Sequence, residues 1–338
     1  MTEREITDIG ILLSEPKAIV IVPHKNPDGD AVGSCLGLYI YLCQLGHDAI
    51  VIAPNDYPDF LKWLPFEKNV IKYDSQEKIA DTYINNADVI FTLDFNALQR
   101  TGDMESVLKA SRAVKIMIDH HQQPDGYASF TYSDVRMSST CEMVFNFIEM
   151  LGGSKYLNPE IATCLYTGIM TDTGSFRYPS TSGKTHRIIA ELIDKGANNA
   201  AIHNAVYDTN SFERLQLLGR ALKNLVVLPE YRTAYITLSQ EDLNEFQHKK
   251  GDTEGFVNYG LSIENIVFAV IFIEQIQEGI TKISFRSKGD FSVNEFARTH
   301  FEGGGHINAA GGKTDLDLSE TLKKFIAILP QYKKALNS

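Results

Sequence analysis

The stretch HKNPDGDAVGS, residues 24–34, joins the apolar run AIVIVP (18–23) to a second apolar stretch. It places one histidine and two aspartates within seven residues, at a turn that Asn and Gly alone could form. A short apolar run that ends in a turn is typical of a buried strand. The stretch therefore predicts a strand, a turn that carries His24, Asp28 and Asp30, and a helix from Ala31 to about Leu45.

The neighbouring residues alternate short apolar runs with amphipathic stretches. Further strands are expected at 47–54, 87–93 and 113–118, and helical spacing is found at 137–151 and 159–171. Such alternation is typical of β-α-β units on a parallel sheet. The sequence therefore predicts an α/β fold whose N-terminal sheet is mostly parallel and flanked by helices.

The C-terminal part predicts a second, smaller α/β unit. Successive helices are expected within 183–225. Strand-like composition follows at 231–238, 264–274 and 279–287. A helical pattern at 292–301 runs into EGGGHINAAGG (302–312), and a final amphipathic helix is expected at 318–336.

Composition limits the class of protein. Hydrophobic residues make up 43% of the 338 residues, and the longest apolar runs are too short to span a bilayer. The N-terminus is acidic and lacks a small-residue cleavage site. The four cysteines form no CxxC pair. We therefore expect a cytoplasmic protein without a membrane anchor and with reduced core cysteines.

The formal net charge of −11 argues against a grip on long nucleic acid. Proteins that bind long DNA or RNA usually present a basic stripe, because neutralising phosphates supplies much of their affinity. No block rich in Lys and Arg is present. A phosphate-containing substrate should therefore be small, with metal ions neutralising its charge.

Three predicted strands end in residues that bind metals readily. His24, Asp28 and Asp30 follow the strand at 18–23, and Asp94 follows the strand at 87–93. Asp119, His120 and His121 follow the strand at 113–118. A fourth candidate, Asp172, lies where a helical pattern breaks into a Thr/Gly turn. Because ligands bind beyond the carboxyl ends of parallel strands, these segments are expected to converge.

Each of these residues also has a simpler structural use. Asp30 could cap the helix that starts at Ala31, Asp94 could form a turn, and His120 could be a buried, hydrogen-bonded histidine. Asp119 could serve only to orient its neighbours. All these uses would have to coincide, and clustered charges without counter-charge are costly. A bound cation is therefore favoured.

The donor set narrows the choice of metal. It is rich in oxygen, has two histidines at most and lacks thiolates, which favours Mn²⁺ or Mg²⁺, with other divalent ions as alternatives. It offers more ligands than one ion needs. Two ions about 3.5–4 Å apart that share bridging carboxylates would use them all and could promote an in-line displacement at phosphorus.

Four motifs, in order, resemble those of the DHH phosphoesterase superfamily: HKNPDGDAVGS, FTLDFN, IMIDHH and YTGIMTDTGSFRY. FRSK and EGGGHINAAGG are similar to the domain that follows in one branch of this superfamily. Together the six motifs resemble the cytoplasmic nanoRNase and pAp-phosphatase type, which also includes enzymes that cleave cyclic dinucleotides. The resemblance covers nearly the whole chain.

The resemblance implies a ligand set for two Mn²⁺ ions. The implied ligands are His24, Asp28, Asp94 and Asp172 for the first ion, and Asp30, Asp94, His120 and Asp172 for the second. Asp94 and Asp172 would bridge the two ions. His121 would lie near the reacting phosphate or support the ligands, and the residues expected to carry catalysis are His121, Asp94 and Asp172.

The run of predicted helices and the resemblance together predict a domain organisation. Residues 1–190 would form the catalytic, metal-binding domain, 191–228 a helical connector, and 229–338 the substrate-binding domain. The active-site cleft would lie between the two domains.

The second domain contributes candidate substrate-binding residues. The first candidates are the neighbours Gly303, Gly304, Gly305 and His306. Their backbone N–H groups, with a helix from about Asn308, would suit a phosphate or a terminal nucleotide, and a flexible loop is the alternative. On the resemblance, Arg286 is preferred to Arg298 as a phosphate or base contact. A solvated charge at a strand end is the alternative for Arg286.

The resemblance implies hydrolysis of short oligoribonucleotides, of about two to five nucleotides, to nucleoside 5′-monophosphates, in keeping with the negative net charge. Removal of the 3′-phosphate from 3′-phosphoadenosine 5′-phosphate (pAp) is a second implied activity. The expected partners are short RNA and small phosphorylated nucleotides, without long nucleic acid or membrane, and the resemblance suggests a homodimer. The alternatives are a c-di-AMP or pApA phosphodiesterase, an inorganic pyrophosphatase, and a non-catalytic nucleotide-binding regulator.

Overall fold

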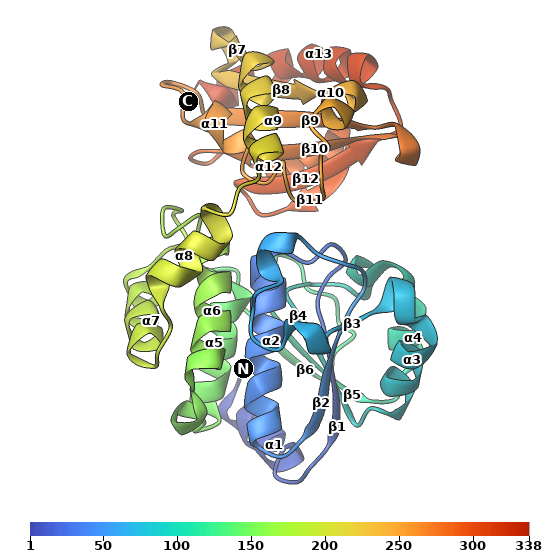
Figure 1. Cartoon of the computed structure of the whole chain (residues 1–338), viewed down its shortest axis with the longest axis vertical. Helices are drawn as coiled ribbons and strands as arrows, with labels where there is room; N and C mark the ends of the chain where they lie inside the picture. The colour runs from blue at the N-terminus through green and yellow to red at the C-terminus, as the bar shows by residue number, and fades with distance from the viewer. Residues whose placement is uncertain (338) are drawn as a thin grey trace. The chain divides into compact units, whose positions relative to one another are not determined.

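The chain forms two compact units, Met1–Thr209 and Asn210–Ser338, in a computed structural model that describes residues 1–337. We call them unit 1 and unit 2, and each has its own sheet and apolar cores (Figure 1). The division lies inside 191–228, the expected connector. Ile202 of α8 (Asn199–Tyr207) is buried in unit 1, whereas Leu217 of α9 (Phe212–Lys223) is buried in unit 2. The cleft expected between the units stays a prediction.

Unit 1 is built on a six-stranded parallel sheet in the order β3-β2-β1-β4-β5-β6. Its strands are β1 (Ala18–Val22), β2 (Asp48–Ala53), β3 (Ile71–Lys72), β4 (Val89–Leu93), β5 (Val114–Asp119) and β6 (Phe130–Ser133). The predicted α/β class with a mostly parallel sheet is confirmed. The strands β3 and β6 were not predicted, because two and four residues are too few to show a period.

Helices cover both faces of this sheet, because successive side chains of a strand point to opposite faces. The helices are α1 (Glu3–Leu12), α2 (Gly29–Gln44), α3 (Tyr73–Asn86), α4 (Glu105–Ala110), α5 (Thr140–Met150), α6 (Pro159–Asp172), α7 (Gly183–Asp194) and α8. Ile19 and Ile21 of β1 share a core with α2, α5 and α6. Val20 and Val22 share another core with α3 and α4 on the opposite face (Figure 1).

The strand order brings β1 and β4 side by side. The chain runs outward from β1 through β2 to β3 and then returns to β4 on the other side of β1. Such a reversal leaves a crevice at the carboxyl ends of the two central strands, where ligands bind in open α/β sheets. His24 and Asp94 lie just beyond these two ends.

Unit 2 has a second six-stranded sheet, in the order β11-β12-β10-β9-β8-β7. Its strands are β7 (Val226–Leu228), β8 (Thr233–Leu238), β9 (Phe268–Gln275), β10 (Ile280–Ser287), β11 (Glu302–Gly305) and β12 (Ala309–Thr314). Only the β8–β9 pair is parallel. The predicted second α/β unit is confirmed, and its three expected strands correspond to β8, β9 and β10.

The helices of unit 2 also lie in two layers. They are α9, α10 (Gln240–Glu245), α11 (Val257–Leu261), α12 (Val293–His300) and α13 (Leu318–Leu336). Phe296 of α12 and Phe325 of α13 share an aromatic core with Phe268 and Phe285 of the sheet. The helices α9, α10 and α11 pack on the other face. None of the helices in residues 1–337 is both long and apolar enough to cross a membrane.

The glycine-rich segment differs from the expectation. Residues 309–314 form strand β12, so the helix predicted from about Asn308 is wrong. The glycines lie in strand β11, where Gly303 pairs with Gly312 and Gly304 with Gly311. A Cβ on Gly303 would lie 2.3 Å from the carbonyl oxygen of Gly311. The close approach of the two strands thus explains this glycine.

Candidate metal centre

The side chains expected to bind metal come together beyond the carboxyl ends of β1, β4 and β5. Each follows from the local fold: His24 and Asp94 lie just beyond the ends of β1 and β4, and His120 follows β5. Asp28 and Asp30 lie at the start of α2, and Asp172 is the last residue of α6. Among residues 1–337 their ligand atoms form small groups, in each of which these atoms lie within 4.8 Å of one another.

The first group consists of His24, Asp28 and Asp94. The Nδ1 atom of His24 lies 2.9 Å from the carbonyl oxygen of Lys25, which turns Nε2 toward the carboxylates. This Nε2 lies 3.4 Å from Oδ2 of Asp94 and 4.0 Å from Oδ2 of Asp28. His24 and Asp94 are buried, whereas the Asp28 side chain is 57% exposed.

The second group consists of Asp30, His120 and Asp172. The Nδ1 atom of His120 lies 3.3 Å from the carbonyl oxygen of Met137. Its Nε2 lies 3.7 Å from Oδ2 of Asp30 and 3.5 Å from Oδ2 of Asp172. Asp172 therefore belongs to the second group only, although the resemblance implied that it also binds the first ion.

Asp94 connects the two groups. Its Oδ2 faces His24, and its Oδ1 lies 3.5 Å from Nε2 of His120. Its backbone has φ +66°, in the left-handed region, and its N–H donates to the carbonyl of Ile118 on the neighbouring strand. Aspartate tolerates this conformation better than most residues. One carboxylate thus faces both groups.

Asp28, rather than the expected Asp30, caps helix α2. Asp28 caps α2, because its Oδ1 accepts from the N–H groups of Asp30 and Ala31. The idea that Asp30 caps this helix is therefore wrong. Asp30 is buried inside the first turn, and its carboxylate instead accepts from the N–H groups of Thr140 and Cys141 at the start of α5.

Asp119 contacts His121. Oδ1 of Asp119 lies 2.7 Å from Nδ1 of His121, and Oδ2 is buried without a hydrogen-bond partner among the described residues. Nδ1 of His121 also lies 3.7 Å from Oδ1 of Asp94. This hydrogen bond agrees with the idea that Asp119 orients a neighbour, and the pair lies beside the carboxylate that connects the two groups.

The carboxylates repel one another in this buried space. Burial and the nearby Asp94 and Asp172 raise the pKa of Asp30 well above its usual range. Burial, together with Asp28 and Asp94, also raises the pKa of Asp172 to about 6 against the opposing effect of His120. Both carboxylates are therefore destabilised in their charged form.

The histidines respond to the same field. Burial alone would lower the pKa of His120, but the carboxylates of Asp94, Asp172 and Asp30 raise it well above its usual range. Burial would raise the pKa of Asp94, but His120 and His24 hold it well below its usual range. Carboxylates that raise the pKa of an imidazole in this way create a field of negative charge, and such a set of oxygen and imidazole donors fits divalent cations such as Mn²⁺ or Mg²⁺.

Two contributors were missed in the sequence. Thr140, at the start of α5, donates its Oγ1 hydrogen to Oδ1 of Asp94 at 3.0 Å and its N–H to Asp30 at 2.6 Å. Asn55, just after β2, exchanges two hydrogen bonds with Asn26 in the loop between β1 and α2. Ser139, directly before Thr140, is a residue type that commonly starts a helix, but no local pattern in the sequence indicates which carboxylates α5 contacts.

The substrate-binding candidates lie in unit 2. Arg286 is part of β10, where its Nη1 donates to the carbonyl of Phe285. Its Nε is buried and has no hydrogen-bond partner among the described residues, although the residue as a whole is half-buried near the end of β10. A buried guanidinium N–H without a partner suits a ligand contact.

The glycines and His306 form a hairpin near another arginine. Gly305 has φ +148°, and the N–H of His306 donates to the carbonyl of Ala309 at 2.7 Å. The N–H of Gly305 and Nε of Arg298 both donate to Oδ1 of Asn294. The alternative of a flexible loop does not apply to the glycines in the strand, and Arg298 lies beside them.

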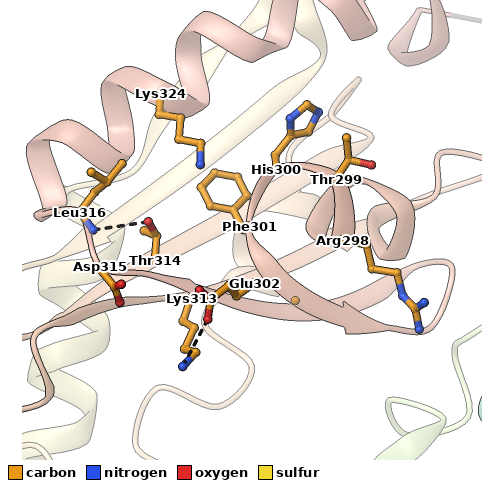
Figure 2. A pocket seen from close by; sticks show the side chains of 11 residues that line it. Arg298, Thr299, His300, Phe301, Glu302, Lys313, Thr314, Asp315, Leu316 and Lys324 are labelled. Atoms are coloured by element: carbon orange, nitrogen blue, oxygen red, sulfur yellow. Dashed lines mark hydrogen bonds and ion pairs between the residues drawn. The ribbon is translucent and has the colours of Figure 1, made fainter.

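A cavity of about 710 Å³ in unit 2 lies at the other end of β11 and β12 (Figure 2). Nζ of Lys313 lies 3.4 Å from Oε2 of Glu302, and Nζ of Lys324 lies 4.8 Å from the centre of the Phe301 ring. Figure 2 shows Arg298 pointing away from these side chains. Glu302 and Asp315 line the cavity together with Lys313, Lys324 and Arg298, so these carboxylates offset most of its positive charge.

Two family models match this chain and identify its class of protein. Residues 18–169 match the N-terminal domain of the DHH family, and residues 232–335 match the DHHA1 domain. The parallel sheet with donor groups beyond its carboxyl edge thus belongs to a DHH-type protein, as the motifs predicted.

Relatives along the full chain define the branch. The chain is 32% identical over 310 residues to the bifunctional oligoribonuclease and PAP phosphatase NrnA of Thermus thermophilus, covering 91% of this chain and 88% of that protein. It is 29% identical to NrnA of Bacillus subtilis, covering 87% and 88%. The chain belongs to the NrnA family of DHH proteins.

A solved structure is similar over the same length. It is that of an exopolyphosphatase-related protein from Bacteroides fragilis, which is 43% identical to this chain with a TM-score of 0.95. The match covers 100% of this chain and 98% of that one. Both units therefore have counterparts in a solved structure.

Proposed function

We propose that this chain is a metal-dependent phosphoesterase that hydrolyses short oligoribonucleotides to nucleoside 5′-monophosphates and removes the 3′-phosphate from pAp. The observation that carries the proposal is the pair of donor groups that Asp94 connects. The names of the NrnA relatives, to which the chain is similar over most of its length, support the substrate class.

Two divalent cations, Mn²⁺ by preference, would occupy the donor groups. The ligands would be His24, Asp28, Asp94 and Asp172 for one ion and Asp30, Asp94, His120 and Asp172 for the other. The pairing of Asp172 with the first ion rests on the family resemblance. When bound, such a pair of ions supplies positive charge at the phosphate and makes water a stronger nucleophile near neutral pH.

The chain's own residues would prepare this chemistry. Thr140 donates to Oδ1 of Asp94, and the N–H groups at the start of α5 hold Asp30, so the carboxylates are oriented before substrate arrives. Asp119 fixes the ring of His121 through Nδ1, so a contact of this ring with a substrate phosphate would be made by Nε2.

Unit 2 would bind the remainder of the substrate. Arg286 has a buried Nε that lacks a partner among the described residues, and a phosphate oxygen or a base acceptor would satisfy it. Gly303, Gly304, Gly305 and His306 would contribute the surface against which a terminal nucleotide lies.

A substrate panel tests the proposal. RNA dimers to pentamers, pAp, pApA, c-di-AMP and tripolyphosphate would be incubated with the enzyme and Mn²⁺, with a chelator as control. We expect metal-dependent release of mononucleotides from the RNA dimers, and of AMP from pAp. The cyclic and linear adenine dinucleotides test the main alternative, and tripolyphosphate is included because of the name of the Bacteroides relative. Lack of metal-dependent turnover of the RNA dimers would contradict the proposal.

The role of Arg286 has a separate test. Arg286→Ala should raise KM for a dinucleotide by more than about tenfold while Mn²⁺ binding is unchanged, because a charged contact to substrate is lost. Lys282→Ala, an exposed position on the same strand, is the matched control. An unchanged KM in the Arg286 variant would remove this residue from the site.

A further inference from the structure

Glu142 is a buried carboxylate that accepts hydrogen bonds from neutral donors. It lies in the first turn of α5 and is 2% exposed. Its Oε2 accepts from the N–H of Ser138 at 3.3 Å, from the hydroxyl of Ser138, and from Oγ1 of Thr185 at 3.0 Å. Burial of a carboxylate is costly, and a leucine or alanine would form the helix without this cost. Helix formation therefore does not explain Glu142.

The contact with Ser138 holds the turn that orients His120. The carbonyl oxygen of Met137, the residue before Ser138, lies 3.3 Å from Nδ1 of His120. Glu142 also holds this turn through its backbone, because its N–H donates to Oγ of Ser139 at 3.0 Å. The position of the Met137 carbonyl, and with it the direction of Nε2 of His120, therefore depends on Glu142.

The contact with Thr185 holds the far end of the segment that begins after Asp172. This segment, residues 173–181, connects α6 to α7. Thr185 is fully buried, and its Oγ1 donates to Glu142 and accepts from the N–H of Ser182, the N-cap of α7, at 3.1 Å. The start of α7 is thus tied to the start of α5, and the segment after Asp172 is fixed at its end.

This segment depends on such an anchor because its backbone is strained. Ser175 and Phe176 have φ +60° and +65°, in the left-handed region. The N–H of Phe176 donates to Oγ1 of Thr173 at 3.0 Å, and the ring of Phe176 packs against Tyr166 with centroids 5.8 Å apart. Strained backbone persists only where the surrounding structure holds it. The contacts at both ends of the segment therefore fix the residue that precedes it, Asp172.

We propose that Glu142 is a positioning residue for the second donor group, which consists of Asp30, His120 and Asp172. The start of α5 reaches all three ligands. Its first N–H groups, beginning with that of Thr140, donate to Asp30. The turn before the helix reaches His120, and the contact with α7 reaches the segment after Asp172. The inference rests on the proposed function only in that divalent cations bind the donor groups.

Calorimetric titration with Mn²⁺ tests this inference without reference to activity. Glu142→Ala should weaken binding of the second ion by at least about 10-fold and leave the first ion unchanged, because residues that orient ligands typically contribute 10–100-fold to metal affinity. Glu149→Ala, at an exposed position on the same helix, is the matched control and should leave both ions unchanged. Asp30→Asn identifies the binding step that belongs to the second group, since Asp30 is a member of that group alone.

Two milder variants accompany the alanine substitution. Glu142→Gln should bind the second ion within about fivefold of the wild type, because an amide oxygen still accepts from Ser138 and Thr185. Thr185→Val keeps the size of the side chain and removes one donor, so it should weaken the second ion by at least about threefold. The valine variant gives the same test if Glu142→Ala does not fold.

The histidine rings provide a readout in the metal-free protein. In ¹H–¹⁵N spectra of Glu142→Ala, the Nδ1 signal of His120 should shift, because the Met137 carbonyl beside it is no longer held. The Nδ1 signal of His24, which lies beside the carbonyl of Lys25, should not shift. A general loss of stability would not distinguish these two rings.

Two outcomes would overturn the inference. One is unchanged binding of the second ion in both Glu142→Ala and Thr185→Val. The other is equal weakening of both ions, which would indicate a general loss of structure. Turnover distinguishes this inference from the proposed function. A wild-type chain that binds two ions but does not cleave an RNA dimer would contradict the proposed function alone. A Glu142→Ala chain that binds both ions and cleaves the dimer as the wild type does would contradict this inference alone.

Discussion

Asp94 holds the central position of the site. It is buried, its backbone is left-handed, and its two carboxylate oxygens face His24 and His120 respectively. A residue held in a sparsely populated conformation at such a point is typical of a functional site. The geometry makes Asp94 the residue whose loss should affect both proposed ions at once.

Asp94→Asn should lower kcat by at least about 10³-fold, equivalent to about 4 kcal/mol of transition-state stabilisation. The amide keeps the shape of the carboxylate but removes the charge shared by the two groups. Steady-state kinetics on an RNA dimer, with calorimetric titration of Mn²⁺, would measure both effects. Asp59→Asn, at an exposed position in unit 1, is the control. Activity near that of the wild type in the Asp94 variant would exclude a bridging role.

Binding of Mn²⁺ should depend on pH. In the metal-free protein the pKa values of Asp30, Asp172 and His120 are raised, so these groups hold protons that a cation must displace. The affinity for Mn²⁺ should therefore rise from about pH 5 to about pH 7, with release of protons. Calorimetry in buffers of different ionisation enthalpy would count these protons. An affinity that is constant over this range would contradict the prediction.

The raised pKa of Asp172 also determines how the free energy of unfolding of the metal-free protein changes with pH. Burial and the neighbouring carboxylates raise the pKa of Asp172 to about 6 from 3.8, so at intermediate pH the folded state holds a proton that the unfolded state has lost. The contribution of Asp172 to the free energy of unfolding should therefore decrease as pH rises from about 4 to about 6.

At the scale of elements, the loop between β1 and α2 is held by a neighbouring strand end. Asn26 is left-handed, with φ +57°. Its N–H donates to Oδ1 of Asn55 at 2.7 Å, and Nδ2 of Asn55 donates to Oδ1 of Asn26 at 2.9 Å. This reciprocal pair fixes the loop that carries His24 and Asp28, so Asn55 is a positioning residue.

Asn55→Ala should weaken Mn²⁺ binding by roughly 10-fold, because residues that orient ligands typically contribute 10–100-fold to metal affinity. Titration calorimetry measures this directly, without reliance on activity. Asn85→Ala, at an exposed position on α3, should leave the affinity unchanged. Equal affinity in both variants would mean that the loop holds its shape without Asn55.

The glycine strand β11 is a second element with a strict geometric need. Gly303→Ala should destabilise unit 2 by about 1–3 kcal/mol, the usual cost of overpacking, because its Cβ would lie 2.3 Å from the Gly311 carbonyl. Gly304→Ala is the matched control, since its Cβ would meet its nearest neighbours at 3.6 Å, an ordinary contact. Urea unfolding measures both, and equal losses would contradict this view of the strand.

At the scale of the whole molecule, two units with separate cores divide the proposed tasks. The donor groups of His24, Asp28, Asp94, Asp30, His120 and Asp172 lie in unit 1, and Arg286 and the glycine strand lie in unit 2. Each unit has apolar cores on both faces of its own sheet. Metal binding should therefore directly stabilise unit 1, which contains the donor groups.

Hydrogen exchange tests this division. Mn²⁺ at about 100 times its dissociation constant should stabilise the metal-binding unit by about 2.7 kcal/mol. Amides of β1, β4 and β5 should exchange more slowly with metal, whereas those of β9 and β10 should not change. Equal slowing in both sheets would contradict a metal site confined to unit 1.

The sequence by itself determined the class of fold and the residue types of the site. Strand-end positions for His24 and Asp94 follow from local apolar runs, and the motifs around them have a fixed order along the chain. Alternation of short strands and helices was likewise sufficient to predict the parallel sheet. These features depend on residues that are close together in the sequence, and for this reason they can be predicted without the structure.

Only the tertiary structure decided which groups meet. That Asp94 lies between His24 and His120, that Thr140 bonds Asp94, and that Asp30 holds the start of α5 all depend on strand order and helix packing. The glycine segment shows the same limit, because Gly303 is required by its pairing with another strand. Contacts between distant segments are set by the packing of whole elements, and no local pattern specifies them.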